Sequence, residues 1–135
     1  MRLFQYPGAK LAIALGLGLL QMGLLAPNAS AHGDWQPRHG GRVNNGGETT
    51  FEVVFCSGRV LVYVSDHGDP VPTAGAKATI EVVRNGEVVT AELRPAGGDK
   101  LEGRIDLTPS RDDSMVVRAV MSNGSVALGR FSAKN

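Results

Sequence analysis

The chain has 135 residues and a formal net charge of +1, with 14 Lys and Arg against 13 Asp and Glu. The charges are interspersed, and neither a concentrated basic patch nor a basic amphipathic helix is visible, which argues against nucleic acid and against a membrane surface as partners. The single cysteine excludes an intramolecular disulfide, so stability has to come from packing.

Residues 1–31 predict a secretory signal peptide. Arg2 and Lys10 form a positive n-region, residues 11–25 are a nearly uncharged apolar run, and residues 29–31 match an A-x-A cleavage site. The alternative is a membrane anchor, but about fifteen apolar residues are fewer than the ~20 that span a bilayer. Cleavage after residue 31 of the 135 leaves 104, enough for one domain. We therefore expect a periplasmic or secreted protein that is not inserted in a membrane once the signal is cleaved.

Residues 32–50 predict a Gly- and His-rich N-terminal arm in front of the domain. The segment is dense in Gly, Asn and His and poor in apolar residues, so we expect it to be flexible, with at most a short edge strand at residues 42–43. Trp35 is its one large apolar side chain and would pin the arm to the domain. That contact would fix the positions of His32 and His39.

A strongly apolar hairpin opens the predicted β-domain, residues 51–135. Residues 51–55 place Phe, Val and Phe on one face, and residues 60–64 are apolar on both faces, which predicts a central strand covered on both sides. The turn between them is Cys-Ser-Gly. We interpret Cys56 as a half-buried residue at a strand end; an intermolecular disulfide and a soft metal ligand are the alternatives.

The rest of the domain predicts further strands with one polar face each. Alternating residues indicate strands near residues 78–82, 89–93, 101–107, 115–121 and 125–131. Asn85-Gly86 and Asn123-Gly124 are signals for tight hairpin turns. Seven strands and no 3.6-residue period predict an all-β fold, an antiparallel two-sheet sandwich of immunoglobulin-like size with about seven to eight strands. A closed small barrel is the alternative.

The sequence does not favour an enzyme. It contains no G-x-S-x-G elbow, and Cys56 lies in a tight hairpin without a base nearby in the sequence. The one pair of adjacent carboxylates, Asp112-Asp113, reads as a solvated turn before a strand.

Metal binding is better supported, because His32, His39 and His67 all lie in Gly-rich loops. Imidazole is a good ligand for Zn, Cu, Ni and Co, and which divalent ion binds stays open. Asp66 would be a fourth ligand or would orient a histidine ring. Cleavage after Ala31 would make His32 the first residue, so that its α-amine and ring could chelate one ion together. The alternative is that each loop histidine is simply solvated.

Four segments resemble a known family. They are Pro37-Arg38-His39-Gly40-Gly41, Phe51 to Val54, Leu61 to Pro70 and Pro72 to Ala76. They are similar to the N-terminal β-sandwich metal-binding domain of periplasmic adaptor subunits from CzcB-type heavy-metal efflux systems, and to free-standing secreted relatives of it. The resemblance implies binding of divalent heavy metals in the periplasm, carried by His39 and His67. The chain lacks the helical hairpin, lipoyl-like domain and barrel of the adaptors, so we expect it to bind metal without bridging a pump.

The leading hypothesis is a small periplasmic or secreted protein that binds divalent Zn, Co, Ni or Cu and supports metal resistance or efflux. It would buffer the metal or hand it over, with a heavy-metal efflux system as its partner. One alternative is a copper carrier resembling the CopC type, a β-sandwich whose mature chain also begins with His. The other is a structural or protein-interaction module without metal.

Overall fold

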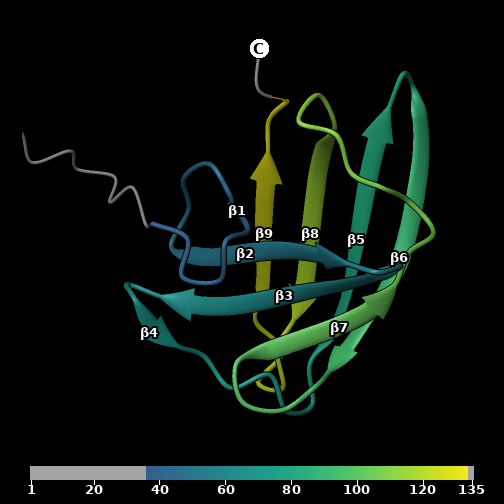
Figure 1. Ribbon diagram of the computed structural model, residues 1–135. Helices are drawn as coiled ribbons and strands as arrows, with labels where there is room; N and C mark the ends of the chain where they lie inside the picture. Colours follow the sequence, from purple (N-terminus) through teal and green to yellow (C-terminus); the bar gives the residue numbers. More distant parts are fainter. Residues whose placement is uncertain (1–35, 134–135) are drawn as a thin grey trace, which may run out of the picture.

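The computed structural model describes residues 36–133, which form nine strands and no helix (Figure 1). The predicted signal peptide, Trp35 and His32 lie outside the described residues. All strand pairs are antiparallel, which confirms the all-β class. No helix that could cross a bilayer occurs between residues 36 and 133. The strands are β1 (Arg42–Val43), β2 (Thr49–Cys56), β3 (Arg59–Asp66), β4 (Asp69–Pro70), β5 (Lys77–Arg84), β6 (Glu87–Pro95), β7 (Lys100–Arg104), β8 (Ser114–Val120) and β9 (Val126–Phe131).

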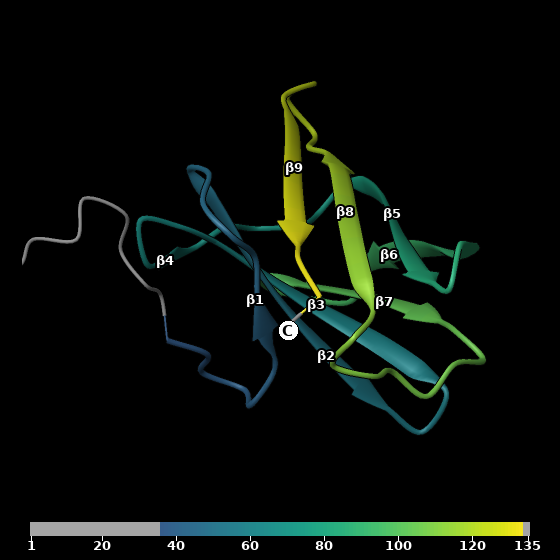
Figure 2. The same ribbon diagram turned by 90° about the horizontal axis from the view of Figure 1, so that it is seen from above.

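The strands form two layers whose directions cross, as Figures 1 and 2 show. The first layer contains β1, β2, β3, β4 and β7, and the second contains β5, β6, β8 and β9. Strand β6 belongs to both, because most of it pairs with β5 while Arg94 and Pro95 pair with β7. The hydrogen-bonded path therefore runs without a break as β1-β2-β3-β7-β6-β5-β8-β9. The predicted sandwich is confirmed, and it is closed along one edge in the manner of a barrel.

At the opposite edge, within residues 36–133, one hydrogen bond between backbone groups joins the two layers. The N–H of Asn45 donates to the carbonyl of Arg130, 2.8 Å away, and so links the segment after β1 to β9. Seven of the nine strands have five or more residues, as many as the alternating sequence predicts.

Two hairpin turns have the backbone conformation that their sequences predict. Ser57 and Gly58 have φ of 49° and 75°, and Asn85 and Gly86 have φ of 50° and 79°. Two consecutive left-handed residues give the turn whose twist matches that of the flanking strands. Glycine adopts this conformation at low cost, which explains its second position in both loops, and asparagine does so more readily than most residues, which explains Asn85.

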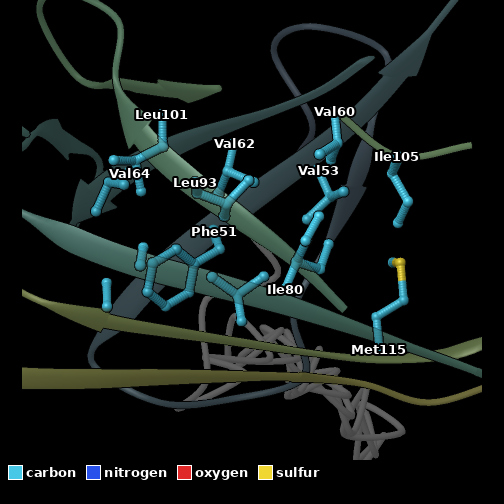
Figure 3. Packing of buried hydrophobic residues seen from close by; sticks show 14 of the residues in the cluster. Phe51, Val53, Val60, Val62, Val64, Ile80, Leu93, Leu101, Ile105 and Met115 are labelled. Atoms are coloured by element: carbon cyan, nitrogen blue, oxygen red, sulfur yellow. The ribbon is translucent and has the colours of Figure 1, made fainter. Parts of the chain in front are cut away.

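The core lies between the layers (Figure 3). The inward-facing hydrophobic residues of β2 and β3 are fully buried except Phe55, which packs partly buried against the core. Residues from β5, β6, the β7 region and β8 meet them, namely Ile80, Leu93, Leu101, Ile105 and Met115. On the outward side of β3, Leu61 and Tyr63 are only half-buried. The prediction that both faces of this strand are covered is therefore wrong. Strand β3 is central because β2 and β7 flank it, and no third layer lies over it in the described residues.

The predicted solvated turn at Asp112-Asp113 is also corrected, because the side chain of Asp113 is only 1% exposed. Its two oxygens accept hydrogen bonds from Nε and Nη2 of Arg84, at 2.8 and 2.6 Å, and the Ser110 N–H donates at 2.7 Å. The guanidinium of Arg42 donates to the Asp113 carbonyl. The side chain is buried because it ties the segment before β8 to β5.

Candidate functional site

The N-terminal segment that precedes β2 is held on the first layer by one carboxylate. Glu52 points outward from β2, yet the residue is only 6% exposed. Its Oε1 accepts the backbone N–H groups of His39 at 2.7 Å and Gly41 at 3.0 Å, and its Oε2 accepts the N–H of Arg38 at 3.0 Å. The described part of the predicted flexible arm is therefore bound to the sheet.

The same contacts determine the charge state of Glu52. Burial alone would raise the pKa of this carboxyl group. The Gly41 N–H, the His39 ring and the backbone N–H groups of His39 and Arg38 together outweigh burial, so the pKa lies below its ordinary value. Glu52 is thus a carboxylate that only accepts hydrogen bonds.

The imidazole of His39 is fixed by two neighbours. Its Nδ1 lies 2.9 Å from Oε2 of Glu52, and its ring stacks on Tyr63 with 3.5 Å between centroids and 4° between planes. Glu52 and Tyr63 are direct partners across β2 and β3, so one register places both the acceptor and the stacking surface. Because the carboxylate accepts, Nδ1 carries a proton, and in the neutral ring Nε2 therefore keeps its lone pair. The side chain as a whole remains 39% exposed, so the ring is accessible from solvent.

Gly41 explains why the segment can lie this close to the strand. A Cβ atom at this position would be 2.5 Å from the Val53 carbonyl oxygen and 2.8 Å from a methyl group of Val54. No side chain fits there without displacing backbone. The close approach places the Gly41 N–H on Glu52 and so fixes the loop that carries His39.

His67 lies in the tight turn between β3 and β4, with φ of 48°. Its Nδ1 is 2.5 Å from Oδ1 of Asp66, and its side chain is 76% exposed. In this geometry Asp66 contacts Nδ1 and leaves the other ring nitrogen, Nε2, without a contact to it. This position suits the second of its two expected roles, that of orienting the ring.

The two histidine-bearing segments are joined by Arg38, whose Nη2 donates to the carbonyl of Gly68 at 3.0 Å. Beside this contact is a small open pocket of about 50 Å³, whose lining includes His39, Tyr63, Gly68 and Asp99. Within residues 36–133, no three His, Cys, Asp or Glu side chains converge as a metal site. The structure therefore brings the loops of His39 and His67 together without a complete ligand set.

Sequence reasoning did not identify Glu52 and Tyr63 as parts of the site. Both lie in strands that read as core, and their contacts with His39 arise only when β2 and β3 pair. A signal was present, since Glu52 is the only charged residue in β2. A carboxylate in a strand as apolar as TTFEVVFC requires hydrogen-bond donors.

Comparisons with known proteins do not place the chain in a family. No family model matches it, and no curated protein matches it. One similar solved structure is the archaellum periplasmic stator protein FlaG from Sulfolobus acidocaldarius, at 14% identity and a TM-score of 0.35. The match covers 58% of this chain and 92% of that one. At that TM-score the likeness supports no inference about this protein.

Glu52→Gln tests how the carboxylate holds the histidine. The amide oxygen can still accept from Gly41 and the His39 N–H, whereas its NH₂ group cannot accept from Arg38 and would donate to the ring Nδ1. We expect the His39 proton to move to Nε2, visible in the ¹⁵N shifts of the ring, and a melting temperature lower by about 5 °C for a loss of ~1 kcal/mol. Glu48→Gln, at an exposed position, is the control. An unchanged tautomer would show that Glu52 does not orient the ring.

Proposed function

We propose that the mature protein is a periplasmic or secreted metal-binding protein that takes up a divalent Zn, Cu, Ni or Co ion without catalysing a reaction. The supporting observation is the imidazole of His39, whose Nδ1 donates to Glu52 while its ring stacks on Tyr63. Histidines that bind metal almost always donate the other ring N–H to such an acceptor, which fixes the tautomer and the ring orientation.

His67 is the second proposed ligand. It repeats the arrangement, with Asp66 at Nδ1, and its turn is joined to the loop of His39 by the bond from Arg38 to the Gly68 carbonyl. Of the two, His39 is the more firmly held, because Glu52 and Tyr63 contact its ring, whereas the side chain of His67 is mostly exposed.

His32 is the proposed third ligand, by its ring and, after signal cleavage, by its α-amine. Such a nitrogen-rich set would hold Cu(II) most tightly among these ions. A protein of this kind buffers a metal ion or passes it to a heavy-metal efflux system. A carrier of the CopC type remains a candidate within the same class, and it requires the free amine of His32.

Calorimetric titration of the mature protein with Zn, Ni, Co and Cu tests the proposal. His39→Gln keeps an N–H donor for Glu52 but removes the nitrogen lone pair, so we expect affinity to fall at least tenfold with little change in the melting temperature of the metal-free protein. His67→Ala should cost about tenfold. Binding no tighter than millimolar for all four ions would contradict the proposal, as would titrations that neither substitution changes.

One added Ala before His32 provides the control for the N-terminal ligand. The extension removes the amine chelate, so Cu(II) affinity should fall more than Zn(II) affinity. Intact mass of the secreted protein must first show that the chain begins at His32. Equal Cu(II) affinities for the extended and native chains would exclude the amine and, with it, the copper carrier of the CopC type.

A further inference from the structure

The outer face of the second layer has an unusual composition along β8 and β9. The inward positions of these strands are buried in the core, so the alternating positions face outward. Six of the seven outward residues are aliphatic or arginine, and the seventh is Ser114; the six are Val116, Arg118, Val120, Val126, Leu128 and Arg130. Val126 and Leu128 are 56% and 44% exposed. The neighbouring strand β5 instead presents a mixed polar series, as a solvated sheet face does.

Strand register arranges these side chains in rows. Arg118 lies opposite Leu128, Val116 opposite Arg130, and Val120 opposite Val126. Lys77 of β5 continues the last of these rows, because it is the partner of Val120. The three cations therefore lie on a diagonal across β9, β8 and β5, and the aliphatic side chains of Leu128, Val120 and Val126 lie together on one side of it.

The cations on this face have no carboxylate partner in the part of the chain that the structure describes. Within residues 36–133, Lys77, Arg118 and Arg130 take part in no ion pair, whereas Arg59, Arg84 and Arg94 each pair with an acidic residue. Glu81 is the acidic residue nearest in register, since it is the partner of Val116. Arginine is enriched in protein interfaces and lysine is depleted, and the fully buried part of such an interface is apolar.

We propose that this face, defined by Lys77, Val120, Val126, Leu128, Arg118 and Arg130, binds a partner protein through a segment in which carboxylates alternate with aliphatic side chains. Charge complementarity determines the choice of partner, because carboxylates would pair with the free guanidinium groups while aliphatic residues cover Val126 and Leu128. An anionic membrane fits less well, since surfaces that bind membranes are rich in Lys and carry Trp or Phe, and the face has one Lys and no aromatic residue. A second copy of the chain would oppose cations to cations.

The face is independent of the proposed metal site. It lies on the outer side of the second layer, whereas Glu52, His39 and Tyr63 lie on the first. Figure 1 shows the two layers with their strands crossed and separate outer faces. Either proposal can therefore fail without the other.

The test uses a synthetic peptide of alternating Leu and Glu, titrated into ¹⁵N-labelled mature protein and followed by NMR. We expect shift changes confined to β8, β9 and the start of β5, with an affinity that weakens as salt is added. The Arg118→Ser, Arg130→Ser double variant should bind at least tenfold more weakly. The matched control is Arg104→Ser, Arg111→Ser, which removes the same charge from exposed positions off this face.

Three outcomes would overturn the proposal. The first is no shift change with the Leu-Glu peptide, and the second is an equal response to a Leu-Lys peptide. The third is binding that the double variant retains in full. Two further measurements complete the test. Co-sedimentation with phosphatidylglycerol vesicles measures membrane binding, and sedimentation of the protein alone measures self-association. Tighter binding to vesicles than to the peptide, or self-association lost in Leu128→Ser, would assign the face to a membrane or to a second copy instead.

Discussion

Asp113→Ala should lower the melting temperature by roughly 10 to 15 °C. The substitution removes the acceptor of two hydrogen bonds from Arg84 and of one from the Ser110 N–H. Hydrogen bonds to charged groups contribute about 1.5 to 3 kcal/mol, and 1 kcal/mol corresponds to about 4 to 8 °C in a domain of this size. Scanning calorimetry measures the shift. A shift below about 3 °C would show that water replaces these contacts at little cost.

Asp113→Asn tests the charge separately, through the pH dependence of stability. The hydrogen bond from Arg84 lowers the pKa of Asp113 below its ordinary value of 3.8, although burial opposes the shift. A carboxyl group with a lowered pKa stabilises the folded state fully above the ordinary value, and this stabilisation is lost as the pH falls through the folded-state pKa.

The difference in unfolding free energy between wild type and Asp113→Asn should therefore be largest near neutral pH and should shrink as the pH falls below 3.8. Urea titrations over that range provide the measurement. Asp112→Asn, at the exposed neighbouring position, should leave the pH profile unchanged. A difference between wild type and Asp113→Asn that is constant with pH would mean that the ionised form is not the source of the stability.

The second large effect is expected at Gly129 in β9. A Cβ atom there would lie 2.5 Å from Cδ2 and 3.2 Å from Cε2 of Phe51, which is fully buried. Overpacking of this kind costs typically 1 to 3 kcal/mol, so Gly129→Ala should lower the melting temperature by about 10 °C.

A double-mutant cycle identifies the cause. In a Phe51→Leu background the smaller side chain leaves room for the new methyl group, so Gly129→Ala should cost much less than in wild type. Urea midpoints of the four proteins give the coupling energy. Additive effects would show that backbone freedom at residue 129, and not contact with Phe51, is what the glycine provides.

Most of the fold could be predicted because strand alternation is a local property. In β5, Ala78, Ile80 and Val82 are buried and the residues between them face outward, as the sequence pattern predicts. The two-residue turn at Asn85-Gly86 could also be predicted from its local sequence. The burial of Asp113 could not be predicted, since Arg84 is 29 residues away and only the pairing of β5 with β8 brings them together.

The candidate site shows the same division. His39 is a candidate metal ligand because it is a histidine in a Gly-rich loop. Its role as a ligand stays a prediction. The ring of His39 is fixed by Glu52 and Tyr63. These contacts depend on the register of β2 against β3 and on the segment before β2, which folds back onto both strands. Residue type alone indicates what chemistry a side chain can perform, whereas its orientation depends on contacts between distant parts of the chain.

Strand β6 has a consequence for how the protein unfolds. Because one strand is hydrogen-bonded into both layers, neither layer can separate from the other while β6 remains intact. We therefore expect the layer with the histidines not to open as an autonomous foldon, so that its local stability is coupled to the global free energy of unfolding. Substitutions far from the histidines, in either layer, would therefore change the fraction of molecules in which His39 and His67 are correctly placed.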